Sequence, residues 1–474
     1  MTKLWPFGIL PLVSEQNLLS KPCLATITSF CKRKGFVYPS SEIYGGLSGI
    51  YDYGPLGVEL LNNIKRMWWK NMVREREDIY GLDGSILMHP KAWEASGHVA
   101  GFTDPLVDCK DCKSRVRPDK LPGWRLKKDN QSGKWQVLEI GETKCPICGG
   151  ELTPEVRQFN VLMETSLGVI EGEKMKAYLK GESCQNIYLD YKNVIDSHSP
   201  SLPFGIGQIG KTFRNEITLG KFLFKTREFE QWDIEYFVNP SEADTAYKKW
   251  KEIRWNWFVN NVQLSEKNLQ WRQHTEDERI FYATDAWDID YKYPWGWDEL
   301  EGLHHRGNYD LTQHGKFSNT DLGFYDQEKD EKITPFIIEA SGGPNRCFLA
   351  IMLENYHEEE IKGRQRIYLS LPPYLAPVQA AILPLVRKDE KLVETARKIY
   401  DELKGRFVVQ YDEQGTVGRR YRRQDEIGTP FCITIDSQTL ENETVTVRER
   451  DSMEQERVKV GEIEGKLSPL LSLP

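Results

Sequence analysis

The chain has 474 residues and a mass of 55.0 kDa, which is typical of two or three domains, and its 39% hydrophobic residues can supply sizeable cores. Its formal net charge of −8 argues against a protein that coats nucleic acid through bulk positive charge, although a local basic patch stays compatible with RNA binding. No apolar run approaches the ~20 residues that a membrane helix needs, so we expect no membrane partner.

The cysteines are unevenly placed. Four form two Cys-x-x-Cys pairs, and five others are scattered in apolar or mixed contexts: Cys23, Cys31, Cys184, Cys347 and Cys432. This pattern predicts a reducing compartment, which we take to be the cytoplasm, and one metal site instead of a disulfide framework. Residues 1–21 show no clear small-residue cleavage site, so we interpret them as a short extension and not as a secretory signal.

The first predicted helix follows a turn cluster, Asp-Tyr-Gly-Pro, at residues 52–55. It begins near Val58 and carries large side chains at helical spacing: Leu61, Ile64, Lys65 and Trp68. By pattern alone, this is the first amphipathic helix of a domain.

The two Cys-x-x-Cys pairs are separated by 32 residues. Four thiolates suit tetrahedral Zn²⁺, and four cysteine ligands leave no open position for catalysis. The sequence therefore predicts a structural zinc site at Cys109, Cys112, Cys145 and Cys148. Between the pairs lies a basic insert whose simplest interpretation is a solvated surface: Arg115, Arg117, Lys120, Arg125, Lys127 and Lys128.

Residues 207–237 predict a β-hairpin with strands over 209–217 and 224–237 and a turn at 218–221. Trp232, Ile234 and Tyr236 share a face that we assign to the core. The other face of the return strand carries Arg227, Phe229, Gln231, Asp233 and Glu235. Such a face is a plausible floor for a substrate with both phosphate and ammonium. A solvated face with surface ion pairs, each worth ~0–1 kcal/mol, explains the pattern equally well.

We predict that residues 240–271 form a helical insert whose tryptophans lie in a hydrophobic core. Trp287, Ile289 and Tyr291 then alternate with acidic residues, which predicts a strand. His304 and His305 have no partner at zinc-ligand spacing, so we expect them to be structural or exposed.

Residues 334–356 predict a short apolar strand that ends at Glu339, a turn at 341–343 and a helix with Pro344 in its first turn. Arg346 lies in that turn. A helix N-terminus attracts anions, and the planar guanidinium suits phosphate. This segment is therefore a candidate phosphate site.

After Gln365, strands and helices alternate, as in an α/β domain. We predict a helix over 388–407, strands over 407–411 and 445–451, and a strand that ends at Asp436. Tyr421 lies within a cluster of four arginines, namely Arg419, Arg420, Arg422 and Arg423. These side chains could contact RNA by charge and stacking, or they could stabilise a helix through ion pairs to Asp425 and Glu426.

Several of these segments together resemble a known family. Phe213-Arg214-Asn215-Glu216, followed by Arg227-Glu228-Phe229-Glu230-Gln231, resembles the second signature motif of class II aminoacyl-tRNA synthetases. Residues 43–70 resemble their first motif, and residues 334–356 resemble their third. In order and spacing, the chain from about Cys23 to about Val460 is similar to the glycyl-tRNA synthetases of the dimeric, single-polypeptide type.

The resemblance implies an α/β fold: an antiparallel class II catalytic sheet flanked by helices, a zinc-binding insertion and a C-terminal α/β anticodon-binding domain. We expect an extension over 1–21, a catalytic domain over 22–365 and an anticodon-binding domain over 366–474. The catalytic domain would contain the zinc insertion at about 106–150 and the helical insert at about 240–275.

The implied function is to activate glycine with ATP and Mg²⁺ to glycyl-adenylate and then transfer glycine to the 3′ end of tRNA(Gly). The first motif builds the dimer interface in the family, so a homodimer is implied. The basic insert would then be a candidate contact to the tRNA acceptor arm.

The resemblance also implies site residues. The catalytic ones are Arg214, Glu216 and Arg346. The ATP site would consist of Arg214, Asn215, Glu216, Phe224, Lys225, Thr226, Arg227, Glu228, Phe229, Glu299, Leu300, Gly343, Pro344, Asn345 and Arg346, with Glu299 also holding Mg²⁺. The glycine site would consist of Arg117, Glu182, Phe229, Glu230, Gln231, Trp232, Asp233, Arg306, Glu339, Ala340, Ser341, Gly342 and Gly343. The tRNA would contact Arg419, Arg420, Arg422 and Arg423.

The chain departs from the family pattern at Lys180, Gly181, Cys184, Asn186, Asp233 and Asn345. These departures keep two alternatives open. One is a class II synthetase for another amino acid, against which the acidic, small-pocket signature argues. The other is a catalytically inactive RNA-binding paralogue, against which the retention of Arg214, Glu299 and Arg346 argues.

Overall fold

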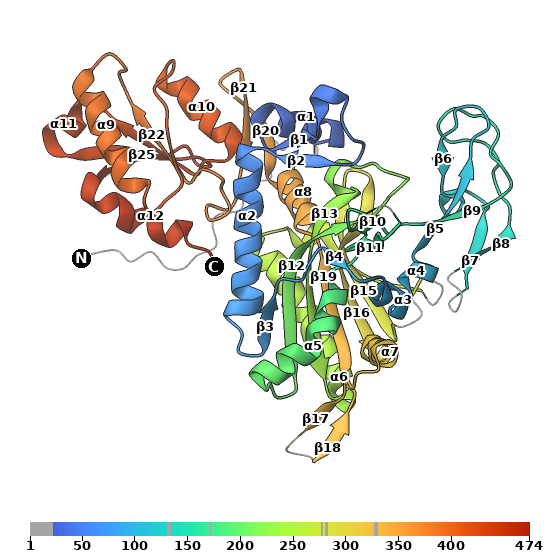
Figure 1. Cartoon of the computed structure of the whole chain (residues 1–474). Helices are drawn as coiled ribbons and strands as arrows, with labels where there is room; N and C mark the ends of the chain where they lie inside the picture. Colours follow the sequence, from blue (N-terminus) through green and yellow to red (C-terminus); the bar gives the residue numbers. More distant parts are fainter. Residues whose placement is uncertain (1–21, 130–133, 171, 276–277, 280–282, 327–329) are drawn as a thin grey trace. The chain divides into compact units, whose positions relative to one another are not determined.

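The computed structural model describes residues 22–129, 134–170, 172–275, 278–279, 283–326 and 330–474 (Figure 1). Its contacts group into two compact units, one of residues 28–351 and one of residues 352–473 with the chain before Thr28. The two divisions fall inside the helices α1 (Leu24–Lys34) and α8 (Pro344–Asn355).

A seven-stranded sheet forms the centre of the larger unit, in the order β14-β15-β16-β19-β13-β12-β3. Neighbouring strands are antiparallel except β12 and β3, which are parallel. The strands are β3 (Ile79–Leu82), β12 (Phe204–Phe213), β13 (Glu228–Val238), β14 (Leu269–Gln273), β15 (Asp285–Tyr293), β16 (Gly296–Gly307) and β19 (Phe336–Gly342).

Both faces of this sheet are covered by helices. On one face, Trp232 of β13 stacks on Trp68 of α2 (Pro55–Trp69) at 5.7 Å, and Tyr236 packs at 5.2 Å against Trp250 of α6 (Ala243–Asn256). The other face packs against α5 (Cys184–His198) and α7 (Tyr309–Ser318). Because strand side chains alternate, both sets on β13 are buried.

Of the two alternatives for the hairpin face, the solvated one is wrong for its second half, since Asp233 and Glu235 are both 0% exposed. The hairpin itself is confirmed: β12 and β13 pair from Phe204↔Phe237 to Phe213↔Glu228. Its connection is longer than predicted and spans residues 214–227, with a 3-10 turn at Phe222–Phe224. Two other predicted boundaries are corrected. Helix α2 begins at Pro55 and not near Val58, and Trp271 lies in strand β14, not in a helix.

Smaller sheets surround this core. The segment around the four cysteines contains the strand orders β6-β5-β9 and β7-β8. A third small sheet has the order β10-β11-β4, in which β4 precedes this segment in the chain. The elements are β4 (Leu87–Met88), α3 (Pro90–Ala95), α4 (His98–Gly101), β5 (Thr103–Asp108), β6 (Arg115–Val116), β7 (Arg125–Lys128), β8 (Trp135–Glu139), β9 (Arg157–Asn160), β10 (Glu164–Leu167) and β11 (Met175–Leu179). Two further hairpins join β1 (Val37–Pro39) to β2 (Tyr51–Tyr53) and β17 (Phe324–Asp326) to β18 (Glu331–Ile333).

The smaller unit is built on a five-stranded sheet in the order β23-β22-β24-β25-β26. Helix α9 buries one stripe against it, Leu392, Ala396, Ile399 and Leu403, as helical periodicity requires. The elements are β20 (Tyr356–Ile361), β21 (Arg364–Leu369), β22 (Ala380–Pro384), α9 (Glu390–Leu403), β23 (Val409–Tyr411), α10 (Val417–Ile427), β24 (Phe431–Ile435), α11 (Ser437–Asn442), β25 (Thr444–Glu449), β26 (Gln455–Lys459) and α12 (Ile463–Leu471). The predicted boundary after residue 365 crosses the β20–β21 hairpin, which groups with this unit.

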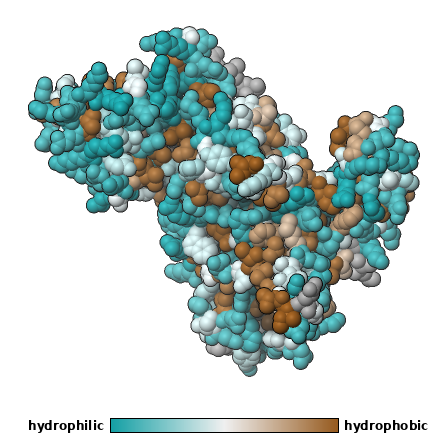
Figure 2. Space-filling model, turned by 45° about the horizontal axis from the view of Figure 1, so that its top comes forward, coloured by the Kyte–Doolittle hydropathy of each residue, from teal (hydrophilic) through white to brown (hydrophobic). Residues whose placement is uncertain are grey.

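In the described part of the chain, no helix combines the length and the apolar character that crossing a bilayer requires. The face in Figure 2 is mostly hydrophilic, with hydrophobic residues in separate patches. Large apolar side chains in the segment before α2 are strongly exposed, with Ile43 at 88% and Tyr44 at 87%.

Candidate active site

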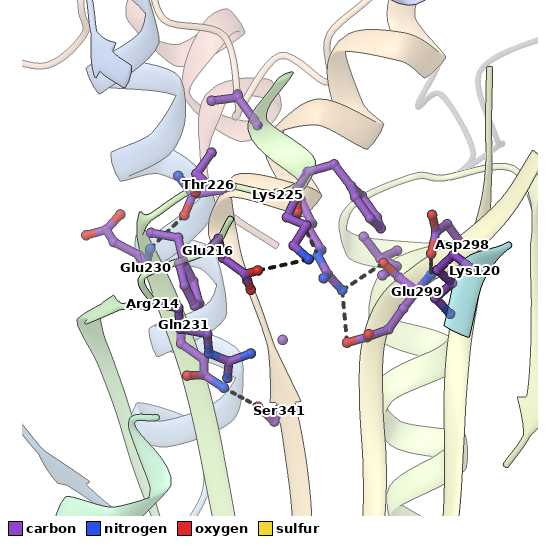
Figure 3. A pocket seen from close by; sticks show the side chains of 18 residues that line it. Lys120, Arg214, Glu216, Lys225, Thr226, Glu230, Gln231, Asp298, Glu299 and Ser341 are labelled. Carbon is purple, nitrogen blue, oxygen red and sulfur yellow. Dashed lines mark hydrogen bonds and ion pairs between the residues drawn. The ribbon is translucent and has the colours of Figure 1, made fainter. Parts of the chain in front are cut away.

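One pocket collects side chains from β13, from the start of β16, from the end of β19, from the first turn of α8 and from the 214–227 connection. In Figure 3, Arg214 and Gln231 lie on one side, and Asp298, Glu299 and Lys120 lie on the opposite side. The lining residues are Lys120, Arg214, Glu216, Leu223, Phe224, Lys225, Thr226, Phe229, Glu230, Gln231, Asp298, Glu299, Leu300, Ser341, Gly342, Gly343, Asn345 and Arg346.

Arg214 is held at the point where β12 ends. Its Nε donates to the Gly181 carbonyl at 3.1 Å, and its guanidinium carbon lies 5.3 Å from the centre of the Phe229 ring. The side chain remains 26% exposed, on the wall of the pocket. These contacts fix a positive charge where an anion can reach it.

Arg346 supplies a second positive charge from the first turn of α8. Its Nη1 lies 2.9 Å from Glu299 Oε1, and its guanidinium carbon lies 4.4 Å from the centre of the Phe224 ring. The 43% exposed Glu299 carboxylate lines the pocket, and carboxylate oxygens are suitable ligands for Mg²⁺. Glu299 is therefore able to hold a cation beside bound phosphate.

Three lining residues were missed from sequence: Lys120, Leu223 and Asp298. Lys120 belongs to the basic insert, whose charge was noted but whose approach to the pocket depends on the fold of the zinc insertion. Asp298 accepts a hydrogen bond from Lys221 Nζ at 2.8 Å. Lys225 and Glu216 also form an ion pair, at 2.9 Å, on the pocket wall.

A cluster of buried carboxyls lies on the α5 face of the sheet. Glu339 is 4% exposed and accepts hydrogen bonds from Arg306 Nη1 at 2.9 Å and from His304 Nδ1 at 2.6 Å. Burial alone would raise the pKa of Glu339, but the charges of Arg306 and His304 lower it to about 2. Glu339 is therefore ionised and already paired.

Asp233 is the least satisfied member of this cluster. It is 0% exposed and lies opposite Ser341 in register, and neither carboxyl oxygen has a hydrogen-bond partner among the described residues. Burial and the nearby charge of Glu339 raise the pKa of Asp233 well above its ordinary value. A cation that reached this carboxyl would find an unpaired, low-dielectric site.

Glu182 is held from another direction. His98 Nε2 lies 3.0 Å from Glu182 Oε2, and Arg214 Nη2 lies 3.6 Å from Oε1. Burial would raise the pKa of this carboxyl, but the charges of His98 and Arg214 lower it well below the ordinary range. Sequence reasoning missed His98, since only the fold brings α4 to this carboxylate.

Several predicted site residues do not line the pocket. Trp232 packs on the helical face, where its Nε1 donates to Glu301 at 2.8 Å, and Ala340 is buried beside it in the sheet. The prediction that these two side chains contact glycine is corrected, because strand alternation turns them away. Arg117 is paired with Asp104 at 2.7 Å and with Asp119 at 2.8 Å.

Glu182, Asp233 and Glu339 also lie outside the pocket lining. The remaining predicted residues outside it have structural contacts. Arg227 donates to the carbonyls of Ser48 at 2.9 Å and Glu216 at 3.1 Å, and Glu228 pairs with Lys211 at 2.6 Å. The Asn215 main-chain N–H donates to the Val161 carbonyl, and Pro344 begins α8. Arg306 Nε donates to Asp310 at 2.9 Å.

Asn345, one of the departures from the family pattern, has a clear role in packing. Its Oδ1 accepts from the Glu230 main-chain N–H at 2.7 Å, and its Nδ2 donates to the Tyr53 hydroxyl. The amide therefore ties the start of α8 to β13 and β2. A carboxylate at this position has no N–H group and could not donate a hydrogen bond to the Tyr53 hydroxyl.

The four predicted zinc ligands converge. Cys109 Sγ lies 3.5 Å from Cys148 Sγ, and Cys112 Sγ lies 3.8 Å from Cys145 Sγ. Tetrahedral coordination at the usual Zn–S bond length places sulfurs about 3.8 Å apart. The cluster therefore fits a structural zinc ion, and it packs against a small core that includes Val107, Trp124 and Leu152.

The arginines of α10 divide into two kinds. Arg420 is 2% exposed and donates to the carbonyl oxygens of Pro384 and Gly415, so its predicted contact to tRNA is corrected to a structural one. Arg419 and Arg423 are exposed, and Arg423 Nε donates to Asp412 at 3.0 Å. Arg422 lies 3.7 Å from Asp425 and is 37% exposed.

Comparisons with known proteins identify both parts of the chain. Residues 168–356 match the tRNA synthetase class II core domain (G, H, P, S and T), and residues 379–470 match an anticodon binding domain. The chain is 49% identical over 444 residues to the glycine–tRNA ligase of Treponema denticola, an alignment that covers 92% of this chain and 95% of that protein.

Two further relatives carry the same name. The chain is 48% identical over 442 residues to the glycine–tRNA ligase of Borreliella burgdorferi, which covers 92% of this chain and 95% of that protein. It is 47% identical over 461 residues to that of Clostridium beijerinckii, which covers 94% and 98%. The chain therefore belongs to the glycine–tRNA ligase family of class II aminoacyl-tRNA synthetases.

Proposed function

We propose that the pocket is the site where this ATP-dependent ligase activates glycine. In the first step, the glycine carboxylate attacks the ATP α-phosphorus, and glycyl-adenylate forms as diphosphate leaves. In the second step, the terminal ribose of tRNA(Gly) takes the glycyl group, and AMP leaves. Positioning and charge stabilisation supply most of the catalysis in such phosphate chemistry.

The ATP would lie between the two pocket arginines. Arg214 would stabilise charge on the α-phosphate, and Arg346 would hold the outer phosphates from the N-terminus of α8, where the helix dipole also favours anions. Mg²⁺ bound with ATP would neutralise phosphate charge, and Glu299 is the residue that would hold it. Phe224 offers a ring face to the nucleotide, and Glu216, Lys225 and Thr226 complete the wall.

The glycine ammonium would pair with the Asp233 carboxylate. This carboxyl carries the proposal, because it is fully buried without a hydrogen-bond partner among the described residues and lies opposite Ser341, which lines the pocket. Glu182 and Glu339 would add negative potential, and Gln231 would help to orient the substrate. Larger amino acids would be excluded by volume, so editing is less necessary than for enzymes that must reject a smaller analogue.

We infer four further properties from the membership of this family. The four-cysteine cluster would bind Zn²⁺ as a structural ion. Exposed Ile43 and Tyr44, which precede the first-motif helix, would lie in a homodimer interface. Arg419, Arg422 and Arg423 would contact tRNA(Gly), and the enzyme would act in the cytoplasm.

The direct test is amino-acid-dependent exchange of labelled diphosphate into ATP without tRNA. Glycine should support exchange, whereas serine and alanine should not. Exchange with another amino acid alone would favour a synthetase of different specificity. Folded protein that supports no exchange with any amino acid would favour a non-catalytic RNA-binding paralogue.

A further inference from the structure

A second group of potential metal ligands lies in the large sheet, away from the cysteines. It consists of His274, which follows β14, Asp288 on β15 and His304 on β16. One nitrogen or oxygen from each residue lies within 4.8 Å of the others. His304 was expected to have no such partners; the correction comes from strand pairing, which brings together residues that are far apart in sequence.

The strands explain why these side chains meet on one face. Asp288 is paired with Gly302 on β16, and His304 is two residues further along, opposite Ala286. The main-chain N–H of His274 donates to the Ala286 carbonyl at 3.0 Å, which continues the β14 edge to the same level. The two imidazole ring centres are 6.0 Å apart, close enough for both rings to serve one ion.

Gly302 allows the His304 ring to approach the strand closely, because a Cβ would lie 2.9 Å from His304 Cε1. A Cβ at this position would lie 3.1 Å from His304 Nε2 and 3.5 Å from Asp288 Oδ1. These two atoms therefore face the space above a residue without a side chain. Asp288 is 3% exposed, while His274 and His304 are 18% and 19% exposed, so the site is buried at its base and reachable from solvent.

The surrounding contacts suit metal ligands. His304 Nδ1 hydrogen-bonds Glu339 Oε2 at 2.6 Å, an arrangement that orients Nε2 towards the cluster. Metal-binding histidines usually donate their other ring N–H to such a carboxylate. His274 Nε2 lies 2.8 Å from Asp288 Oδ2, and its Nδ1 is buried with no hydrogen-bond partner among the described residues.

One contact opposes a cation, because Arg272 also pairs with Asp288 through Oδ2. It leaves Oδ1 available, and Arg272 has a second carboxylate in Asp290 at 3.5 Å. Asp288 and Asp290 offset part of the positive charge of a divalent ion and this arginine, whereas Glu339 is already paired with Arg306.

We propose that His274, Asp288 and His304 form a second metal site, for a divalent transition ion such as Zn²⁺. Two imidazoles and one carboxylate suit zinc and its neighbours better than Mg²⁺. Three protein ligands leave one coordination position for water or a small ligand. The site touches the proposed glycine pocket through the His304–Glu339 hydrogen bond, but its existence does not depend on that function.

The first test is the metal content of the full-length chain after dialysis against zinc. We expect two ions per chain, one ion in His274→Ala and one in the double variant Cys112→Ser/Cys148→Ser. His198→Ala is the matched control, because it removes an exposed histidine outside the cluster and should keep both ions. The same metal content in His274→Ala as in the unaltered chain would overturn the proposal.

A second measurement does not rely on variants that fold. Co²⁺ in the cysteine site gives thiolate-to-cobalt charge-transfer bands, whereas Co²⁺ bound by nitrogen and oxygen gives only weaker d–d bands. A thiol-directed mercurial should remove the first set and leave one cobalt with the second. Loss of all cobalt on mercurial treatment would contradict the proposal.

Discussion

Each unit contains a fully buried aspartate, and the two aspartates differ in how their carboxyl groups are hydrogen-bonded. In the smaller unit, Asp425 is 0% exposed, and Arg448 donates to its two oxygens at 2.8 Å and 3.1 Å. Arg366 adds a third hydrogen bond at 3.0 Å. In the larger unit, Asp233 is equally buried, yet neither of its oxygens has a partner among the described residues.

This difference separates a structural charge from a functional one. A buried carboxylate is costly unless opposite charges and hydrogen bonds compensate for the lost water, and Asp425 has both. Asp233 has no hydrogen-bond partner among the described residues, so its ionised form would need compensation from a group outside the chain. Perturbed, incompletely paired groups of this kind occur preferentially where substrates bind.

The largest expected effect is on stability in the fully paired network. Asp425→Asn would leave the buried Arg448 without its counter-ion and would remove one of the two carboxylates that pair with Arg366, so it should lower the free energy of unfolding by ~3–5 kcal/mol. Urea denaturation measures this change. Asp401→Asn, which alters an exposed ion pair with Lys404, should cost ~0–1 kcal/mol. Equal losses of unfolding free energy in both variants would show that the buried network stabilises the protein no more than an exposed ion pair does.

The next effect is catalytic. Arg214→Ala removes the pocket charge proposed to stabilise the α-phosphate, so glycine-dependent diphosphate exchange should fall by ~10²–10³-fold. Lys211→Ala removes a charge nearby on β12, which pairs with Glu228 at 2.6 Å and does not line the pocket. Exchange should change little in that control. Intact adenylate formation in Arg214→Ala would exclude the proposed role.

Asp233→Asn should separate binding from stability. Loss of one charged hydrogen bond to the ammonium is worth ~1.5–3 kcal/mol, so the KM for glycine should rise by roughly 10–100-fold. The free energy of unfolding should stay the same or increase, because the variant carries no buried acid that lacks a partner. Steady-state exchange and urea denaturation provide the two values. A destabilised variant with normal KM would make Asp233 a structural residue like Asp425.

The pH dependence of glycine binding gives a finer test. Burial and the nearby charge of Glu339 raise the pKa of Asp233, which favours the protonated carboxyl while no cation is bound. An ammonium favours the ionised carboxylate, and binding glycine therefore releases that proton. The KM for glycine should fall as pH rises, and Asp233→Asn should flatten the profile. A KM for glycine that rises with pH would contradict the release of a proton on glycine binding.

The smallest effect concerns tRNA. Arg419→Ala removes one exposed positive charge from α10 and should weaken tRNA(Gly) binding modestly, with a salt slope reduced by about one. Filter binding at several salt concentrations measures the slope. Arg397→Ala, on α9, removes an arginine that lies over the Tyr411 ring and serves as the matched control. An equal slope in both variants would remove Arg419 from the tRNA interface.

Local sequence pattern predicted the elements better than it predicted their environment. Alternation identified the β12–β13 hairpin, and the spacing of the cysteines identified a cluster that the structure brings together. The burial of Asp233 was not predictable, because one strand cannot show that helices cover both faces of its sheet. His98 and His274 were missed for a related reason, since their partners come from distant segments.

The central claim is that the unpaired carboxyl of Asp233 is the ammonium site of glycine. Thermal unfolding with and without glycine and a non-hydrolysable ATP analogue tests it most directly, because a ligand stabilises only a protein that binds it. With the ATP analogue present throughout, we expect glycine to raise the Tm of the unaltered chain and of Asp425→Asn further, but to have little effect on Asp233→Asn. An equal increase in all three proteins would contradict the claim.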